Sequence, residues 1–223
     1  MQGWLAGRTG TADKLRENKL PGRWTAMTKQ VEFYFDIVSP ASYLAWTQMP
    51  KFAAQTGAEV LYRPFFLPGL FQTAGSASPI TVPNKGRWLF QDLIAWAKRY
   101  GVPFRMNSKF PMSSLTAMRG LIAWQDKPEF MALGNGFYQA MWVDDRDISD
   151  GEVIADVVQA AGISPQDFTA AVQDPAIKQR VFDINEELAA RGAFGAPTFF
   201  VGKKMFWGQD RLDFVAEALS EAG

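Results

Sequence analysis

The chain has 223 residues, of which 48% are hydrophobic and 21% charged, and its 23 basic and 23 acidic residues leave no net charge. This composition suits one globular unit or one domain carrying a large insertion. The chain lacks the basic excess of nucleic-acid-binding proteins. It also lacks the run of about eighteen apolar residues that a membrane helix needs. Because the sequence contains no cysteine and no histidine, it excludes disulfides, thiol nucleophiles, histidine triads and Cys/His metal sites. We therefore expect no metal, nucleic-acid or membrane partner, and a cytoplasmic location.

The N-terminal segment differs in composition from the rest of the chain. Basic residues outnumber acidic ones in residues 1–29, and the segment lacks the apolar core of a secretory signal. We interpret residues 1–29 as a flexible extension. Met27 stands just ahead of the first strand-like run, so translation could start at Met1 or at Met27.

The first regular elements form a β–α–β pattern. Residues 31–37 (VEFYFDI) are apolar on both faces, which predicts a buried strand. A helical pattern follows from Pro40 to about Gln55, with Ser39 as its N-cap and Gly57 at its end. Residues 58–67 (AEVLYRPFFL) predict a second strand. Strands this close, joined by one helix, predict a parallel pair with a right-handed crossover.

The middle and the end of the chain predict a helical block followed by a hairpin and a helix. Helical periodicity recurs from Lys85 to Arg191, and Pro197–Gly208 indicates two strands turning at Gly202-Lys203 before a last helix from Asp210. The order βαβ…ββα is typical of a thioredoxin-like α/β domain, here interrupted by an all-helical insertion domain. We assign residues 30–75 and 193–223 to the thioredoxin-like domain and 76–192 to the insertion.

Four positions are candidates for a binding site. Ser39 follows a strand and begins a helix, where amides and the helix dipole favour an anion, although it could be only an N-cap. Ala196-Pro197 opens a strand; if its bond is cis, the Ala196 backbone is free to pair with an extended ligand, whereas a trans proline would merely start the strand. Asp210 could hold an ammonium group or simply cap the last helix, and Lys85 is by itself an ordinary surface lysine.

Three separated segments, FYFDIVSPASYLAW, VPNKGRWLFQDLIAWAKRYGVPF and ARGAFGAPTFFVGKKMFWGQDRLDFV, together resemble the 2-hydroxychromene-2-carboxylate isomerase family. That family is similar to the kappa-class glutathione transferases and has a thioredoxin-like fold. The resemblance covers about residues 30–222. It implies a homodimer that binds glutathione between its two domains and acts on a small aromatic substrate.

The resemblance also implies roles for individual residues. Ser39 would donate a hydrogen bond to the glutathione sulfur and favour its thiolate. Ala196, before the cis proline Pro197, would pair its backbone with the cysteinyl portion. Gln209 and Asp210 would receive the γ-glutamyl end, and Lys85 would lie near the glycine carboxylate.

The chain departs from the family pattern at a few positions. Ser76 stands where the family usually has asparagine, and Gln209 where it has asparagine or serine. The segment INEEL (residues 184–188) replaces the family's NTEEA ahead of the proline motif. This replacement would change the acceptor pocket, and with it the substrate. Ser76 and Gln209 remain candidate glutathione contacts.

The leading hypothesis is a glutathione-dependent isomerase of aromatic catabolism. The thiolate of bound glutathione would add to the chromene carboxylate and open its ring, which allows rotation about a single bond. Elimination of the thiolate would then give trans-o-hydroxybenzylidenepyruvate. One alternative is a kappa-like glutathione transferase, and another is a non-catalytic glutathione- or peptide-binding module. A disulfide oxidoreductase is excluded because the chain has no cysteine.

Overall fold

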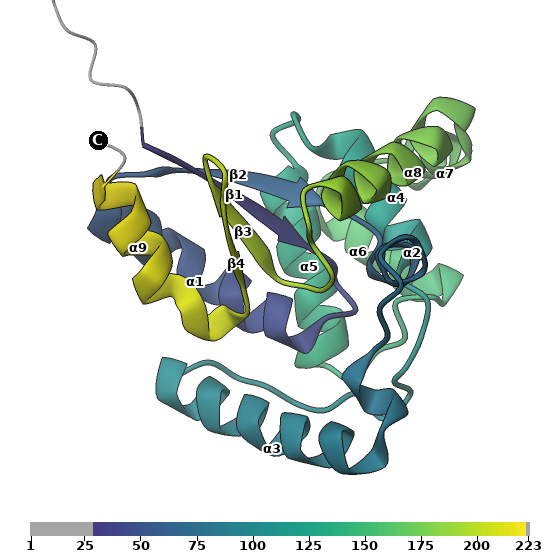
Figure 1. Ribbon diagram of the computed structural model, residues 1–223. Helices are drawn as coiled ribbons and strands as arrows, with labels where there is room; N and C mark the ends of the chain where they lie inside the picture. Colours follow the sequence, from purple (N-terminus) through teal and green to yellow (C-terminus); the bar gives the residue numbers. More distant parts are fainter. Residues whose placement is uncertain (1–28, 222–223) are drawn as a thin grey trace, which may run out of the picture.

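A computed structural model describes residues 29–221, so the predictions for residues 1–28 lie outside the described part. Its centre is a four-stranded sheet of order β2-β1-β3-β4, formed by β1 (Gln30–Phe35), β2 (Glu59–Pro64), β3 (Thr198–Val201) and β4 (Lys204–Trp207). β1 and β2 are parallel, whereas β1–β3 and β3–β4 are antiparallel. The predicted parallel pairing of the first two strands and the order βαβ…ββα along the chain are therefore confirmed (Figure 1).

Helix α1 (Pro40–Thr56) begins and ends where the sequence predicts. The Ser39 side chain accepts a hydrogen bond from the Ser42 amide, and Pro40 occupies the first turn, where its missing N–H is no loss. Gly57 ends the helix in the left-handed conformation, with φ of 66°. The helix packs its apolar side on the sheet through Trp46. The Trp46 and Phe35 rings pack edge-on, with their centroids 5.0 Å apart.

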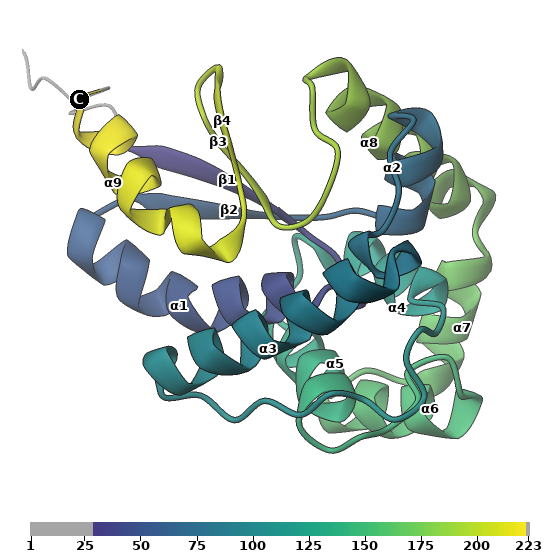
Figure 2. The same cartoon turned by 60° about the horizontal axis from the view of Figure 1, so that its bottom comes forward.

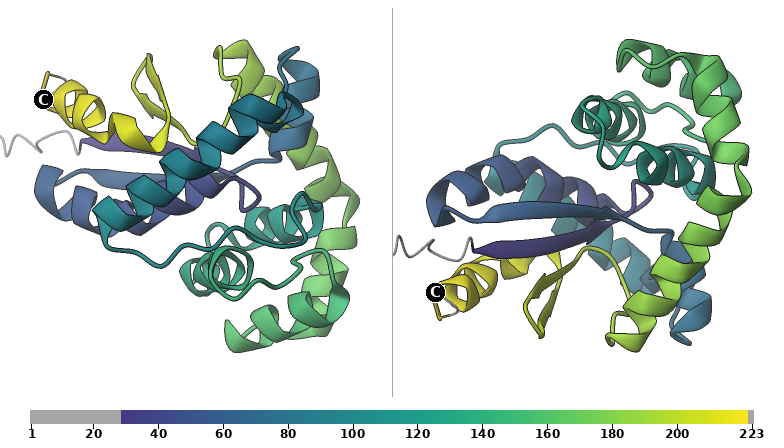
Figure 3. Two further views of the ribbon diagram at one scale, coloured as in Figure 1. Left: turned by 90° about the horizontal axis from the view of Figure 1, so that it is seen from below. Right: turned by 90° about the horizontal axis from the view of Figure 1, so that it is seen from above.

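The middle of the chain is helical from Lys85 onwards, as predicted, and this part is preceded by one helix and one 3-10 turn that the sequence did not predict. Its elements are α2 (Leu67–Thr73), the 3-10 turn η1 (Pro79–Thr81), α3 (Pro83–Tyr100), α4 (Leu115–Trp124), α5 (Phe130–Trp142), α6 (Gly151–Ala160), α7 (Pro165–Gln173) and α8 (Pro175–Ala190). Ser164 caps α7 as the sequence indicates. Helix α3 crosses α1 (Figure 2), while α4 to α8 gather at the end of the sheet where β1 and β2 finish (Figure 3). The boundaries 76 and 192 of the insertion stay a prediction.

Several element ends differ from the prediction. β1 ends at Phe35 and not at Ile37, so Asp36 follows the strand. β2 ends at Pro64 and not at Leu67, because the Leu67 amide donates to the Asp36 carboxylate and Leu67 starts α2. The last helix, α9 (Leu212–Glu221), begins after a separate 3-10 turn, η2 (Gln209–Arg211), so Asp210 lies within that turn and does not cap α9. The hairpin between β3 and β4 turns at Gly202-Lys203, as predicted, with φ of 58° at the glycine.

One continuous core joins the sheet to the helical block. α1 and α9 lie on the same face of the sheet and pack against each other (Figure 1). The rings of Phe33, Phe35, Trp46 and Tyr138 pack at centroid distances of 5.0 to 6.5 Å and carry the core from β1 through α1 into α5. Across residues 29–221, no helix is both long and apolar enough to cross a membrane.

Candidate functional site

Ser39 lies where β1 leads into α1, and its side chain is almost fully buried, with 5% of the residue exposed. Its hydroxyl accepts a hydrogen bond from the Ser42 amide at 3.1 Å and donates one to the Ala196 carbonyl at 3.2 Å. The first turn of a helix leaves backbone amides without intrahelical partners and carries a partial positive charge. The hydroxyl therefore belongs to a position that suits an anion.

The Ala196-Pro197 peptide bond is cis, and it lies against Ser39 although the two segments are 157 residues apart in sequence. The Pro197 carbonyl in turn accepts a hydrogen bond from the Gly208 amide at 3.0 Å. Gly208 has a φ of 114°, a conformation open chiefly to glycine. This contact brings the Gly208-Gln209-Asp210 segment beside the proline loop.

Gln209 and Asp210 stand in η2, next to the C-terminal end of α3. Gln209 is buried, and its carbonyl accepts a hydrogen bond from the Tyr100 hydroxyl at 2.9 Å. Burial, helped by the negative charges of Asp210 and Asp213, raises the pKa of Tyr100 to about 12, so this hydroxyl stays a donor. The Asp210 carboxylate pairs with Arg211 at 2.9 Å and is partly exposed, so it is accessible to a cationic group.

Lys85 and Ser76 are not joined to this group by any hydrogen bond among the described residues. Lys85 lies exposed in the first turn of α3, which crosses α1 (Figure 2). Ser76 follows α2 and donates its amide to the Phe71 carbonyl at 2.9 Å. Their roles at the site stay predictions.

Six tryptophan and methionine side chains of the helical block are candidates to line an acceptor cavity, and they differ in burial. Trp124 and Trp142 are buried, and the Trp142 indole donates to the Ile37 carbonyl at 2.8 Å, which makes both core residues. Trp88 is 63% exposed on α3. The remaining three are partly buried against the core: Trp96, Met106 and Met112.

Asp36 is a residue beside the site that sequence reasoning missed. It is completely buried, and its two carboxylate oxygens accept hydrogen bonds from the amides of Val38 at 2.9 Å and Leu67 at 2.7 Å. Burial raises the pKa of Asp36 to about 6, although these amides oppose the shift. The available signal was an acid directly after a strand that is apolar on both faces.

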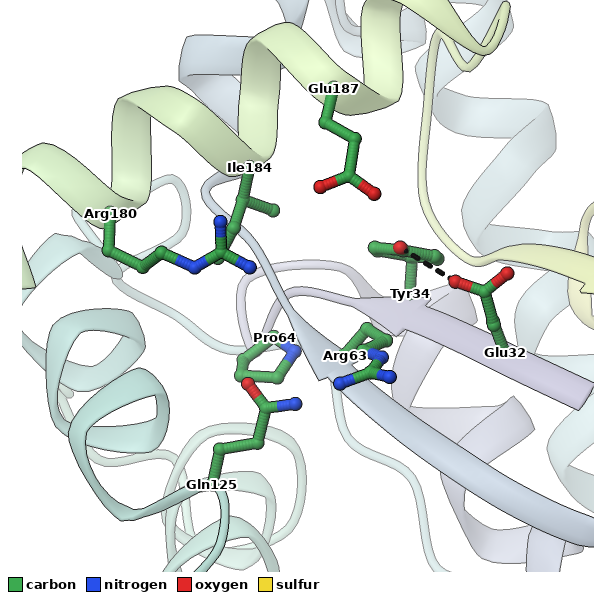
Figure 4. A pocket seen from close by; sticks show the side chains of 8 residues that line it. All are labelled: Glu32, Tyr34, Arg63, Pro64, Gln125, Arg180, Ile184 and Glu187. Carbon is green, nitrogen blue, oxygen red and sulfur yellow. Dashed lines mark hydrogen bonds between the residues drawn. The ribbon is translucent and has the colours of Figure 1, made fainter.

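A hollow lies on the face of the sheet away from α1. Its volume is about 160 Å³ and its lining residues, drawn in Figure 4, are Glu32, Tyr34, Arg63, Pro64, Gln125, Arg180, Ile184 and Glu187. Beside it, Arg191 binds both carboxylate oxygens of Glu32 at 2.7 and 2.9 Å, and the Tyr34 hydroxyl donates to the same carboxylate. The predicted site residues all lie elsewhere. Within residues 29–221, no cluster of Cys, His, Asp and Glu side chains could hold a metal ion.

Comparison with known proteins connects this arrangement to a family. Residues 30–220 match the DSBA-like thioredoxin domain. The chain is 33% identical over 195 residues to a 2-hydroxychromene-2-carboxylate isomerase of Sphingobium xenophagum, covering 86% of this chain and 99% of that protein. It is 26% identical to a kappa-class protein of Caenorhabditis elegans, glutathione S-transferase kappa 2, over 86% of this chain and 92% of that one.

A solved structure agrees with these sequence matches. A 2-hydroxychromene-2-carboxylate isomerase structure superposes with a TM-score of 0.78 and 27% identity, over 86% of this chain and 95% of that chain. The chain belongs to the DSBA-like thioredoxin family, within the group of the 2-hydroxychromene-2-carboxylate isomerases.

Proposed function

We propose that the protein is a glutathione-dependent isomerase that interconverts 2-hydroxychromene-2-carboxylate and trans-o-hydroxybenzylidenepyruvate. The supporting observation is the buried Ser39 hydroxyl at the start of α1, in contact with the Ala196 carbonyl. The names of several relatives at 28–33% identity give the isomerase reaction. The kappa-class relatives carry glutathione in their names.

The donor set fits a thiol tripeptide. An extended backbone could pair with the chain at Ala196, while Asp210 offers a carboxylate to an ammonium group and the amides of the first turn of α1 offer donors to an anion. Hydrogen bonds join Ser39 to Ala196, and Pro197 to Gly208, which directly precedes Gln209 and Asp210. Bound glutathione would supply the thiol for reversible addition to the substrate, which this cysteine-free chain cannot supply.

Ser39 would act as a hydrogen-bond donor and not as a nucleophile. Its hydroxyl proton points at the Ala196 carbonyl, and its oxygen already accepts from the Ser42 amide. To stabilise a thiolate, the hydroxyl must rotate its proton from Ala196 to the sulfur while Ser42 keeps the oxygen in place. Charge-assisted hydrogen bonds of this kind are stronger than neutral ones, so the proton would favour the thiolate over the thiol.

Replacement of Ser39 by alanine tests this assignment. We expect Ser39→Ala to lower kcat by about tenfold or more, since it removes a charge-assisted hydrogen bond of about 1.5–3 kcal/mol, while the Kd for glutathione measured by calorimetry changes little. Ser164→Ala is the matched control, because Ser164 also caps a helix whose next residue is proline but lies in α7. Equal activities of Ser39→Ala and the parent protein would refute the assignment.

A kappa-like transferase is the second candidate, favoured by relatives at 24–26% identity. The two reactions differ in their use of glutathione. An isomerase regenerates it, so chromene turnover should leave the total free thiol unchanged. Net loss of thiol with formation of a conjugate would favour the transferase, and absence of glutathione binding would leave a non-catalytic module.

A further inference from the structure

Asp36 is an ionisable group that the proposed chemistry does not use. It has no exposed surface, and no Lys or Arg among the described residues pairs with it. A buried carboxylate without a cation is costly to ionise. Such a group in a buried place beside a candidate site is therefore a candidate for a functional role.

Asp36 contacts the turn that carries Ser39 through both its backbone and its side chain. Its carbonyl accepts a hydrogen bond from the Ser39 amide at 3.1 Å, and one carboxylate oxygen accepts from the amide of Val38, the residue before Ser39. The other carboxylate oxygen accepts from the Leu67 amide at the start of α2. The Asp36 side chain thus links the turn between β1 and α1, at Val38, to the start of α2, while its backbone carbonyl holds the Ser39 amide.

The surroundings of Asp36 are nearly free of other charges. From α5, Tyr138 donates its hydroxyl to the Asp36 carbonyl at 3.4 Å, and burial raises the pKa of this tyrosine well above its usual value. From α4, the Met118 sulfur accepts from the Ile37 amide at 3.4 Å. Ser114 and Ser42 are buried nearby, Ser114 beside the Asp36 carboxylate and Ser42 beside the Tyr138 hydroxyl, and each favours the ionised form of its neighbour. Tyr138 is therefore the ionisable side chain that faces Asp36 from the helical block.

We propose that Asp36 is the positioning residue of the Ser39 site: its carboxylate holds the turn that presents the Ser39 hydroxyl and the first amides of α1 to an anionic ligand. The identity of that ligand, the glutathione thiolate, rests on the proposed function. The positioning itself rests on the contacts of Asp36 and is independent of the ligand.

The first measurement needs no glutathione. The backbone amide signals of Ser39 and Ser42, followed by NMR across pH 4.5 to 8, should titrate in the parent protein together with the Asp36 carboxyl, at a midpoint of about pH 6. Asp36→Asn should abolish this titration, because a side-chain amide does not ionise between pH 4.5 and 8, and it has only one acceptor oxygen for the two backbone amides. If the Ser39 and Ser42 signals of the parent protein do not follow Asp36, the proposal fails, whether or not the variant folds.

The second measurement uses glutathione and reads the ultraviolet absorbance of its thiolate on the protein. The charge of Asp36 alone would repel a nearby thiolate, so removing only that charge should lower the pKa of the bound thiol. Loss of the positioned Ser39 hydroxyl and helix amides would instead raise the pKa of the bound thiol. We expect Asp36→Asn to raise the pKa of the bound thiol by about one unit, a tenfold loss of thiolate below that pKa, and a pKa that falls or stays unchanged would overturn the proposal.

Asp145→Asn is the matched control. Asp145 also accepts a backbone amide, that of Ser108 at 2.6 Å, but it lies in the helical block away from Ser39. This variant should leave the Ser39 and Ser42 titrations and the thiol pKa unchanged. A parent protein that produces no thiolate signal would contradict the proposed function, while the titration without glutathione would still decide the role of Asp36.

Discussion

The residues around Ser39 combine an N-cap, the first turn of a helix and a buried carboxylate within four positions of the chain. Ser39 and Asp36 are both almost free of solvent contact, and both are tied to backbone groups of distant segments, Ala196 and Leu67. The sequence predicts the cap and its neighbour Pro40 from local rules. The contacts to Ala196 and Leu67 depend on how the chain returns to this point, and no local rule predicts them.

Asp36 should make stability depend on pH. Its pKa is raised from 3.8 to about 6 in the folded protein, so the folded state binds the proton more tightly than the unfolded state does. Its contribution to stability is therefore largest below about pH 4 and is lost as the pH rises through about 6. At pH 7 the ionised group should disfavour folding by about 3 kcal/mol relative to an unshifted carboxyl.

The comparison of the parent protein with Asp36→Asn isolates this contribution. From pH 7 to pH 4.5, the free energy of unfolding of the parent protein should rise by about 2 kcal/mol relative to that of the variant. Urea denaturation of both proteins at a series of pH values measures the difference. A difference that is independent of pH would show that Asp36 does not carry the raised pKa.

At the scale of elements, the helices pack through glycines that admit large rings. A Cβ added to Gly120 of α4 would lie 2.1 Å from an atom of the buried Phe168 ring in α7, and one added to Gly134 of α5 would lie 2.7 Å from the Trp46 ring. Because these rings belong to other elements, the α4–α7 and α1–α5 contacts require glycine. Helical periodicity predicts these helices but not which of their glycines stand opposite a ring.

Gly120→Ala should therefore destabilise the protein, although alanine is the better helix former. We expect a loss of about 1–3 kcal/mol in the free energy of unfolding, as for other overpacked cores. Gly151→Ala at the start of α6 is the control, because a Cβ there meets nothing within 4 Å. It should be neutral or stabilise by up to about 1 kcal/mol, and equal effects of the two changes in chemical denaturation would contradict the packing argument.

At the scale of the whole molecule, the helical block returns to the sheet through Arg191, directly after α8. Its guanidinium binds both oxygens of Glu32 on β1 and lies 3.6 Å from the centroid of the Phe200 ring on β3. Burial raises the pKa of Glu32, but the hydrogen bonds from Arg191 and Tyr34 outweigh it and hold that pKa below its usual value. This contact joins the end of the block to two central strands.

Arg191→Ala should consequently weaken the whole fold. The loss of a partly buried, bidentate pair and of its contact with Phe200 should lower the free energy of unfolding by about 1.5–3 kcal/mol. Lys204→Ala removes the exposed pair with Glu221 and should change it by less than about 1 kcal/mol. Similar losses in the two variants, measured by urea denaturation, would rule out a special role for Arg191.

The sequence by itself determined the element order, the caps Ser39, Gly57 and Ser164, and the hairpin turn at Gly202, because each depends on residues within a few positions of one another. It also determined that thiol chemistry needs an external thiol, since the chain has no cysteine. Only the tertiary structure decided that Ser39 meets Ala196, that Asp36 is buried beneath this turn, and that Asp210 falls in a separate 3-10 turn. Those features depend on long-range packing and on the loss of water around a carboxylate, and both arise only when segments distant in sequence come together.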